Sequence, residues 1–136
     1  MKATVTLIIL VFCIRALGQS PVAAIKLEQR IFAKVRALPE VESFYHDAQK
    51  NKPTITLDDW PPNPGCYEVR VAISNFDQLR TNFVFIVNAK LKIYYLDTFT
   101  ESGTKIITLE QWRRWRKTPA WQKIHVYKAG KFISGK

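Results

Sequence analysis

The stretch Tyr67-Glu68-Val69-Arg70-Val71-Ala72-Ile73-Ser74 decides the fold class, because its apolar residues recur at every second position. Side chains alternate between the two faces of a β-strand, so this pattern predicts a strand with one buried face. Downstream, residues 83–87 are apolar on both faces and are expected at the centre of a sheet. A turn at residues 88–90 leads to a further strand over 91–96, and a polar loop over 97–105 is expected after it. Three strands joined by short loops predict an antiparallel meander.

Two helices are expected before this meander. From Pro21 to Leu38 the apolar residues form one stripe of helical period, and Pro39 ends the pattern. A short strand over 54–57 and a loop with three prolines over 60–65 lie between the helices and the meander. The predicted class is α+β, with the first helix covering one face of the sheet. A second short helix is indicated by apolar residues at i, i+3, i+4 and i+7, which are Val41, Phe44, Tyr45 and Ala48.

The length and composition indicate one folded domain with an uneven charge. The chain has 136 residues and is 47% hydrophobic, which argues against a disordered or fibrous protein. Its formal net charge of +10 favours anionic partners. Residues 19–101 carry ten basic and ten acidic side chains, whereas residues 105–136 carry nine basic side chains and one acidic side chain. The excess positive charge after the first 18 residues therefore lies in the last 32 residues.

The first 18 residues are typical of a secretory signal peptide. Lys2 precedes an apolar run from Val5 to Ile14, and residues 16–18 offer small residues for cleavage near Gly18/Gln19. The alternative is a short membrane anchor, but a transmembrane helix needs about 20 apolar residues, roughly twice this run. We expect an exported protein, periplasmic or secreted, with a single domain over 19–136 and no membrane span after cleavage.

The basic C-terminal segment, residues 105–136, is predicted to begin with a short helix. Thr108 and Gln111 have the spacing of a capping box. In one interpretation Leu109 and Trp112 dock on the sheet and the arginines face solvent. In the other, the helix binds an anionic group or partner through Arg113, Arg114, Trp115, Arg116 and Lys117. A hairpin over residues 122–134 is expected to follow.

Residue patterns for catalysis or metal binding are weak in this sequence. Cys66 is the one cysteine after the signal segment, so the mature chain is expected to contain no disulfide and no cysteine-based zinc site. His46 and His125 have no spacing typical of metal ligands, and adjacent Asp58 and Asp59 would point to opposite faces of a strand. We therefore predict a non-enzymatic protein without cofactor or metal. A small hydrolase is the remote alternative, and it requires a histidine to meet Cys66 or an aspartate.

Five segments carry a resemblance to known domains, which are Leu38-Pro39-Glu40-Val41 and residues 67–71, 82–87, 92–98 and 107–113. Together they resemble small secreted bacterial domains of the PepSY-like and cystatin-like kinds, in which a helix precedes an antiparallel meander. The resemblance covers about residues 36–116. It implies an exported module that binds or inhibits other proteins, and it carries over no catalytic residue.

These observations predict an exported, non-catalytic binding module for a protein or peptide, with inhibition of an exported enzyme as one form of that role. Trp60, in the proline-rich loop, is the candidate partner contact. The alternative is an anionic-surface binder, in which the basic C-terminal segment meets a membrane, a glycan or another polyanion. The export signal argues against a nucleic-acid partner.

Overall fold

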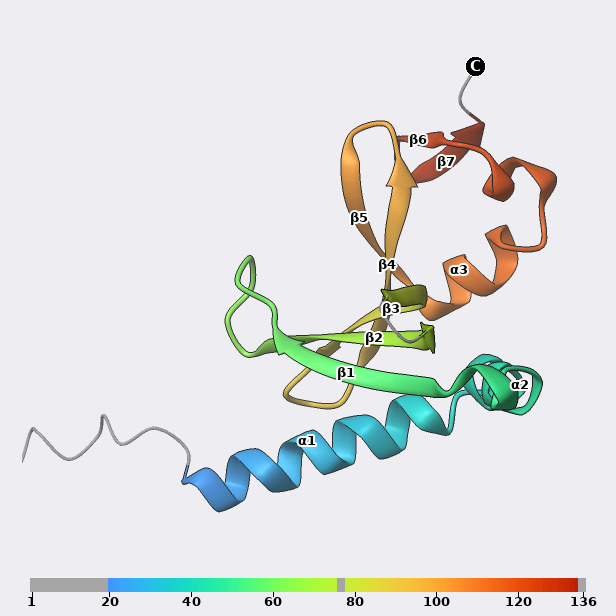
Figure 1. Cartoon of the computed structure of the whole chain (residues 1–136). Coiled ribbons are helices and arrows are strands. Elements are labelled where there is room, and N and C mark those ends of the chain that lie inside the picture. The colour runs from blue at the N-terminus through green and yellow to red at the C-terminus, as the bar shows by residue number, and fades with distance from the viewer. Residues whose placement is uncertain (1–19, 76–77, 135–136) are drawn as a thin grey trace, which may run out of the picture.

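The computed structural model describes residues 20–75 and 78–134, and the predicted signal segment, residues 1–18, lies outside the described residues (Figure 1). None of the described helices is long and apolar enough to cross a membrane. In chain order the elements are α1 (Pro21–Arg36), α2 (Pro39–Asp47), the 3-10 helix η1 (Gln49–Asn51), β1 (Pro53–Asp59), β2 (Cys66–Asn75), β3 (Gln78–Asn88), β4 (Ile93–Thr100), β5 (Gly103–Thr108), α3 (Leu109–Trp115), the 3-10 helix η2 (Pro119–Gln122), β6 (His125–Lys128) and β7 (Lys131–Ser134).

The strands form one mostly antiparallel sheet, which confirms the α+β class and the meander. The order is β1-β2-β3-β4-β6-β7, and β5 pairs with β4 outside this path. β3 lies between β2 and β4, as the apolar run over 83–87 predicts. The exception to the antiparallel pairing is a parallel contact between Thr100 of β4 and His125 of β6.

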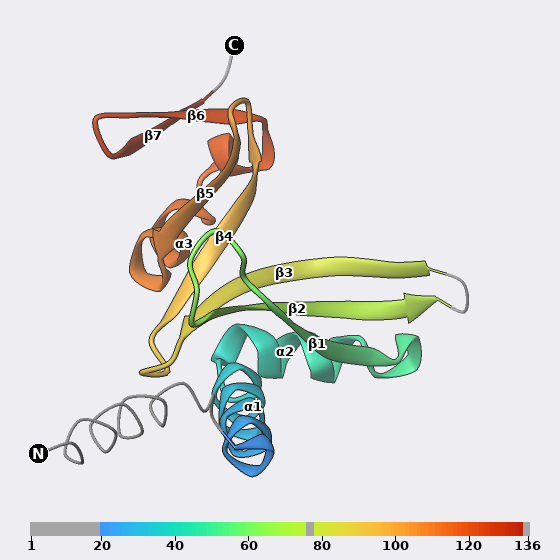
Figure 2. The ribbon, with the colours of Figure 1, turned by 90° about the vertical axis from the view of Figure 1, so that its left-hand side faces the viewer.

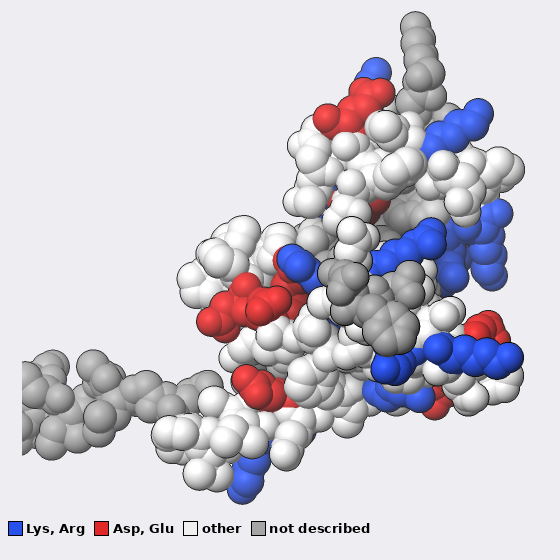
Figure 3. All heavy atoms as spheres, viewed as in Figure 1, with Lys and Arg blue, Asp and Glu red and all other residues white. Residues whose placement is uncertain are grey.

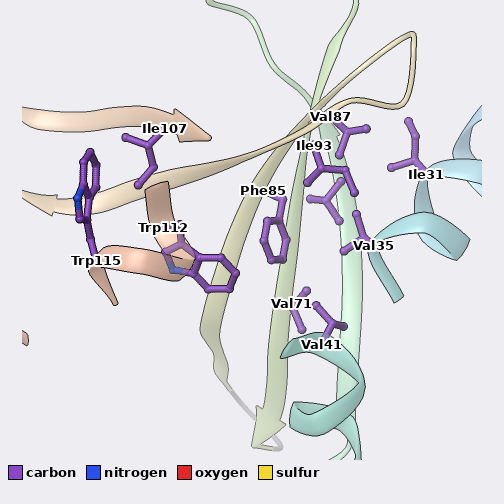
Figure 4. Close-up of a cluster of buried hydrophobic side chains, with 11 residues drawn as sticks. Ile31, Val35, Val41, Val71, Phe85, Val87, Ile93, Ile107, Trp112 and Trp115 are labelled. Carbon is purple, nitrogen blue, oxygen red and sulfur yellow. The ribbon is translucent and has the colours of Figure 1, made fainter. Parts of the chain in front are cut away.

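The main core lies between the sheet and the helices (Figures 2 and 4). Phe85 and Val87 of β3 face Ile31 and Val35 of α1 in this core, and all four side chains are fully buried. Ile86, between them in sequence, points to the opposite face of the sheet. The alternation of β3 and the covering role of the first helix are thus confirmed.

The first helix begins at Pro21 as predicted, and it differs from its prediction in its C-terminal boundary and in the exposure of its N-terminal half. It stops at Arg36, because Leu38 has an extended backbone and forms the N-cap of α2. Its N-terminal half projects beyond the sheet (Figure 1), so Val22 and Ile25 remain 61% and 54% exposed. The apolar stripe is therefore buried from its middle to its C-terminal end.

A second difference concerns residues 97–105, which the sequence pattern assigns to a polar loop. This expectation is wrong: β4 continues to Thr100, and β5 begins at Gly103 after a tight turn. Asp97 suggested the loop, yet its side chain is buried and its carboxylate accepts hydrogen bonds. A charged residue in a strand is tolerated where its acceptors are satisfied.

The β4–β5 hairpin leaves the plane of β1, β2 and β3 (Figure 2). β3 and β4 are paired over three residue positions, from Val87 with Ile93 to Phe85 with Tyr95. Beyond these pairs the two strands diverge, and α3 packs against β4 and β5. The predicted C-terminal hairpin is confirmed as β6–β7, whose turn places Ala129 and Gly130 at positive φ.

Candidate functional site

The start of α3 is fixed by a capping box at the end of β5. The hydroxyl of Thr108 accepts a hydrogen bond from the backbone N–H of Gln111 at 3.1 Å. In return, the Gln111 side-chain oxygen accepts one from the backbone N–H of Thr108 at 3.0 Å. This confirms the predicted cap, and it sets which face of α3 each residue of the basic segment occupies.

The two tryptophans of α3 lie in the core. Trp112 is 1% exposed and Trp115 is 9% exposed. The Trp115 ring lies 5.0 Å from Phe132 and 5.8 Å from Tyr127, measured between ring centroids. Trp115 thus attaches the β6–β7 hairpin to α3. Its burial fits the docked interpretation of this helix, and its ring does not stand on the surface where a ligand would stack.

Arg113 forms an ion pair with Glu40 of α2. Its Nε donates to one carboxylate oxygen at 2.6 Å and its terminal nitrogen donates to the other at 3.0 Å. These hydrogen bonds lower the pKa of Glu40 and raise that of Arg113. Because both partners are held in a fork-to-fork geometry, Arg113 ties α2 to α3 and is not a free cation.

Arg116 occupies a different environment from the other basic residues of this segment. The central carbon of its guanidinium lies 4.4 Å from the ring centroid of Trp112 and 5.7 Å from that of Phe83. It forms no ion pair with the described part of the chain. By contrast, Arg114 and Lys117 are exposed to solvent. Arg116 is therefore a half-buried cation held against aromatic rings; the Glu40 carboxylate is near enough to feel its charge but forms its ion pair with Arg113.

Arg116 lines a cavity of about 410 Å³, which we call the α3 hollow. Tyr95 stacks on Trp112 within it, with centroids 4.5 Å apart and planes at 8°. Burial, followed by the charge of Asp97, raises the pKa of Tyr95 to about 12, so its phenol is neutral near pH 7. The hollow combines aromatic walls, two amides and a cation, and its lining residues are Asn82, Phe83, Tyr95, Phe99, Trp112, Arg116, Trp121 and Gln122.

This combination suits an anionic group attached to an apolar or planar body. Binding pockets in proteins are commonly apolar, with a few polar groups that fix the orientation of the ligand. Lysine and arginine side chains also gather around the side of the molecule that carries α3, α2 and η1 (Figure 3). A second hollow, between α2 and α3, shares Arg116 and adds Lys117, Ser43 and the Glu40–Arg113 ion pair. Arg116 thus lines hollows on two sides of α3.

Trp60 lies at a separate cavity of about 370 Å³, which we call the Trp60 hollow. Glu68, Arg70 and Val84 line it, and strand alternation places them on the sheet face opposite the helices. Glu68 and Arg70 form an ion pair there. Asn82 and Tyr95 line both hollows. Trp60 and the basic helix, predicted separately, thus lie near one another across β3 and β4.

A buried polar cluster links β4 to β6, and sequence reasoning missed it. Oδ2 of Asp97 lies 2.6 Å from Nε2 of His125 and 2.6 Å from the hydroxyl of Tyr127. Nδ1 of His125 faces the backbone carbonyl of Lys123 at 2.8 Å. Burial and the Asp97 carboxylate raise the pKa of Tyr127. The available signal was that His125 and Tyr127 fall on one face of the same predicted strand.

The hydrolase alternative required a histidine to meet Cys66 or an aspartate. His125 does meet Asp97, but His125 is fully buried and both its ring nitrogens have partners. His46 is exposed beside Asp47. Cys66 is a half-buried free thiol at the start of β2. The His125–Asp97 contact fits a structural cluster that fastens β6 to β4, because the His125 ring is closed off from solvent.

Comparisons with known proteins do not add a family to this description. No family model, no curated protein and no solved structure matches the chain. The resemblance to PepSY-like and cystatin-like domains therefore stays a prediction. Within the described residues, no three His, Cys, Asp or Glu side chains gather as a metal ion would require. The site must be interpreted from its own geometry.

Proposed function

We propose that this chain is an exported, non-catalytic binding module that holds an acidic group of a protein or peptide partner in the α3 hollow. The observation that carries the proposal is Arg116, a half-buried guanidinium on the Trp112 ring with no ion pair among the described residues. An arginine can bind a carboxylate through two parallel charge-assisted hydrogen bonds. The amides of Asn82 and Gln122 offer further polar contacts beside it.

The environment of Arg116 favours a bound carboxylate more than a fully exposed arginine would. Exposed ion pairs contribute little, about 0–1 kcal/mol, because water and salt screen them. Arg116 is half-buried beside the aromatic residues of the α3 hollow and is therefore less screened than a fully exposed arginine. The ring of Trp112 also restrains the guanidinium before the ligand arrives, so less side-chain entropy is lost on binding.

The test is a titration with a short peptide in which Glu alternates with Thr, blocked at both ends. Trp112 and Trp121 line the hollow, so their intrinsic fluorescence reports binding. We expect Arg116→Gln to weaken the binding of this peptide at least about tenfold, which corresponds to about 1.4 kcal/mol of binding free energy. Arg114→Gln is the matched control, since it removes an exposed charge from the same segment outside the hollow. Equal losses in both variants, or equal binding of a peptide with Gln for Glu, would refute the proposal.

A second candidate is attachment to an anionic membrane through the β6–β7 hairpin. Ile124 and Ile133 are 53% and 44% exposed there, beside exposed Lys128 and Lys131. Apolar and basic side chains together favour an anionic lipid surface. Sedimentation with phosphatidylglycerol vesicles tests this, with phosphatidylcholine vesicles as the control. Lys128→Gln combined with Lys131→Gln should abolish the binding; unchanged binding would exclude the hairpin.

The proposed export has its own test. The expected signal segment, residues 1–18, directs the chain out of the cytoplasm if it acts as the sequence predicts. N-terminal sequencing of the protein from its producing cells should then begin at or near Gln19. A mature chain that still begins at Met1 would contradict export with cleavage.

A further inference from the structure

β3 has a strand edge without a partner in the described part of the sheet. Pairing with β2 extends along the whole of β3, from Asn88 to Gln78. Pairing with β4 ends at Phe85, so residues 78–84 have no neighbouring strand on that side. All residues from 78 to 82 are exposed. Such an edge presents unpaired backbone N–H and C=O groups that can pair with another chain.

This free edge runs directly into the candidate site. Asn82 and Phe83 belong to β3 and also line the α3 hollow. Thr81, Asn82 and Val84 line the Trp60 hollow on the other side of the sheet. A register shift between Val71 and Ala72 of β2 leaves Asn82 as the extra residue of a bulge in β3. β3 and β4 diverge here (Figure 2), and the α3 hollow and the Trp60 hollow are lined from opposite faces of the sheet.

We propose that the acidic partner segment binds in extended form, as an added strand along the free edge of β3. The proposal rests on the proposed function and specifies the form of its ligand. Side chains of an added strand alternate between the two faces. One set would enter the α3 hollow, where an acidic residue meets Arg116. The other set would face the Trp60 hollow, whose lining includes Trp60, Thr81, Thr98 and Thr104.

Charge decides which strand occupies the edge. Arg80 is exposed on β3 itself, and Arg116 lies in the adjoining hollow. A second copy of this chain would bring the same basic residues and a net positive charge to the contact. Like charges across an interface disfavour such a pairing, whereas an acidic peptide is attracted. The occupant is therefore an extended acidic segment of another protein.

The test uses the same alternating Glu–Thr peptide with N-methyl groups on alternate backbone nitrogens. In an added strand, alternate N–H groups point toward the protein and the rest point to solvent. Methylation of one set should weaken binding at least about tenfold, and methylation of the other set should change it less than about twofold. Hydrogen exchange provides a second readout: the peptide should slow exchange of backbone amides within 79–84.

The outcomes separate this inference from the proposed function. If the two methylated peptides bind equally well while Arg116→Gln still removes binding, strand addition is wrong, but the α3 hollow remains the binding site. If hydrogen exchange slows in the β6–β7 hairpin and not in β3, the peptide binds elsewhere and the inference fails. If Arg116→Gln has no effect but one methylated set fails to bind, the β3 edge is the site and the role of Arg116 is refuted.

Discussion

Replacing Asp97 with alanine should reduce the free energy of unfolding by about 3–5 kcal/mol, the range for breaking a buried charged pair. The carboxylate accepts hydrogen bonds from the His125 ring, the Tyr127 hydroxyl and the backbone N–H of Phe99. Asp97 is 1% exposed and His125 is fully buried, so water cannot replace the lost acceptor. Domains of this size are stable by about 5–15 kcal/mol, and the variant therefore loses a large share of that stability.

Urea unfolding followed by tryptophan fluorescence measures this loss, with Asp59→Ala as the matched control. Asp59 is exposed at the end of β1, and its removal should change stability by less than about 0.5 kcal/mol. Tyr127→Phe removes one hydrogen bond to the carboxylate and should cost about 1–3 kcal/mol. If the free energies of unfolding of Asp97→Ala and Asp59→Ala differ by less than about 0.5 kcal/mol, the cluster does not fasten β6 to β4.

Four further results are expected. Glu40 has a lowered pKa in the folded chain, so its pair with Arg113 stabilises the protein above about pH 4.5, and this stabilisation is lost as the pH falls further. Arg113→Gln should therefore lower the free energy of unfolding by about 1 kcal/mol at pH 7 and reduce its loss at acidic pH, as measured by denaturant unfolding. Phe85→Ala should cost about 3–5 kcal/mol, since the ring is fully buried; a loss below about 1 kcal/mol would contradict its central place. Trp115→Ala should also cost about 3–5 kcal/mol, and a variant as stable as the wild type would mean that Trp115 is not docked. Cys66 should react slowly with a thiol reagent in the native protein and quickly in urea, whereas fast native labelling would indicate an activated thiol.

Local periodicity was enough to predict the centre of the fold. The alternation around Val69 and Phe85 assigns each residue to a sheet face, because the strand repeat of two is a property of the backbone. The capping box at Thr108 was equally visible, since its two hydrogen bonds connect residues three positions apart. The β4–β5 hairpin was not, because Asp97 resembles a loop residue until its partners on β6 are known.

The sequence predicted which segment of the chain carries the candidate site, but not which of its residues meet a ligand. Charge alone selected residues 113–117 and did not distinguish the residues that pack or pair within the fold from those that are available to a ligand. Arg113 differs from Arg116 because it pairs with Glu40, which lies 73 positions before Arg113 in the chain. The α3 hollow likewise combines residues of β3, β4, α3 and η2. Such contacts depend on how the chain folds back on itself, and no local pattern encodes them.

The central claim is that Arg116 and the rings around it receive an acidic segment, and nuclear magnetic resonance of the labelled side chains tests it directly. During titration with the alternating Glu–Thr peptide, the Nε–H signal of Arg116 and the indole N–H signal of Trp121 should shift together, because both side chains line the α3 hollow. The Nε–H signal of Arg114 should stay in place, since its side chain is exposed outside the hollow. Shifts confined to Arg114 and to the lysines of the β6–β7 hairpin, with Arg116 unmoved, would contradict the claim.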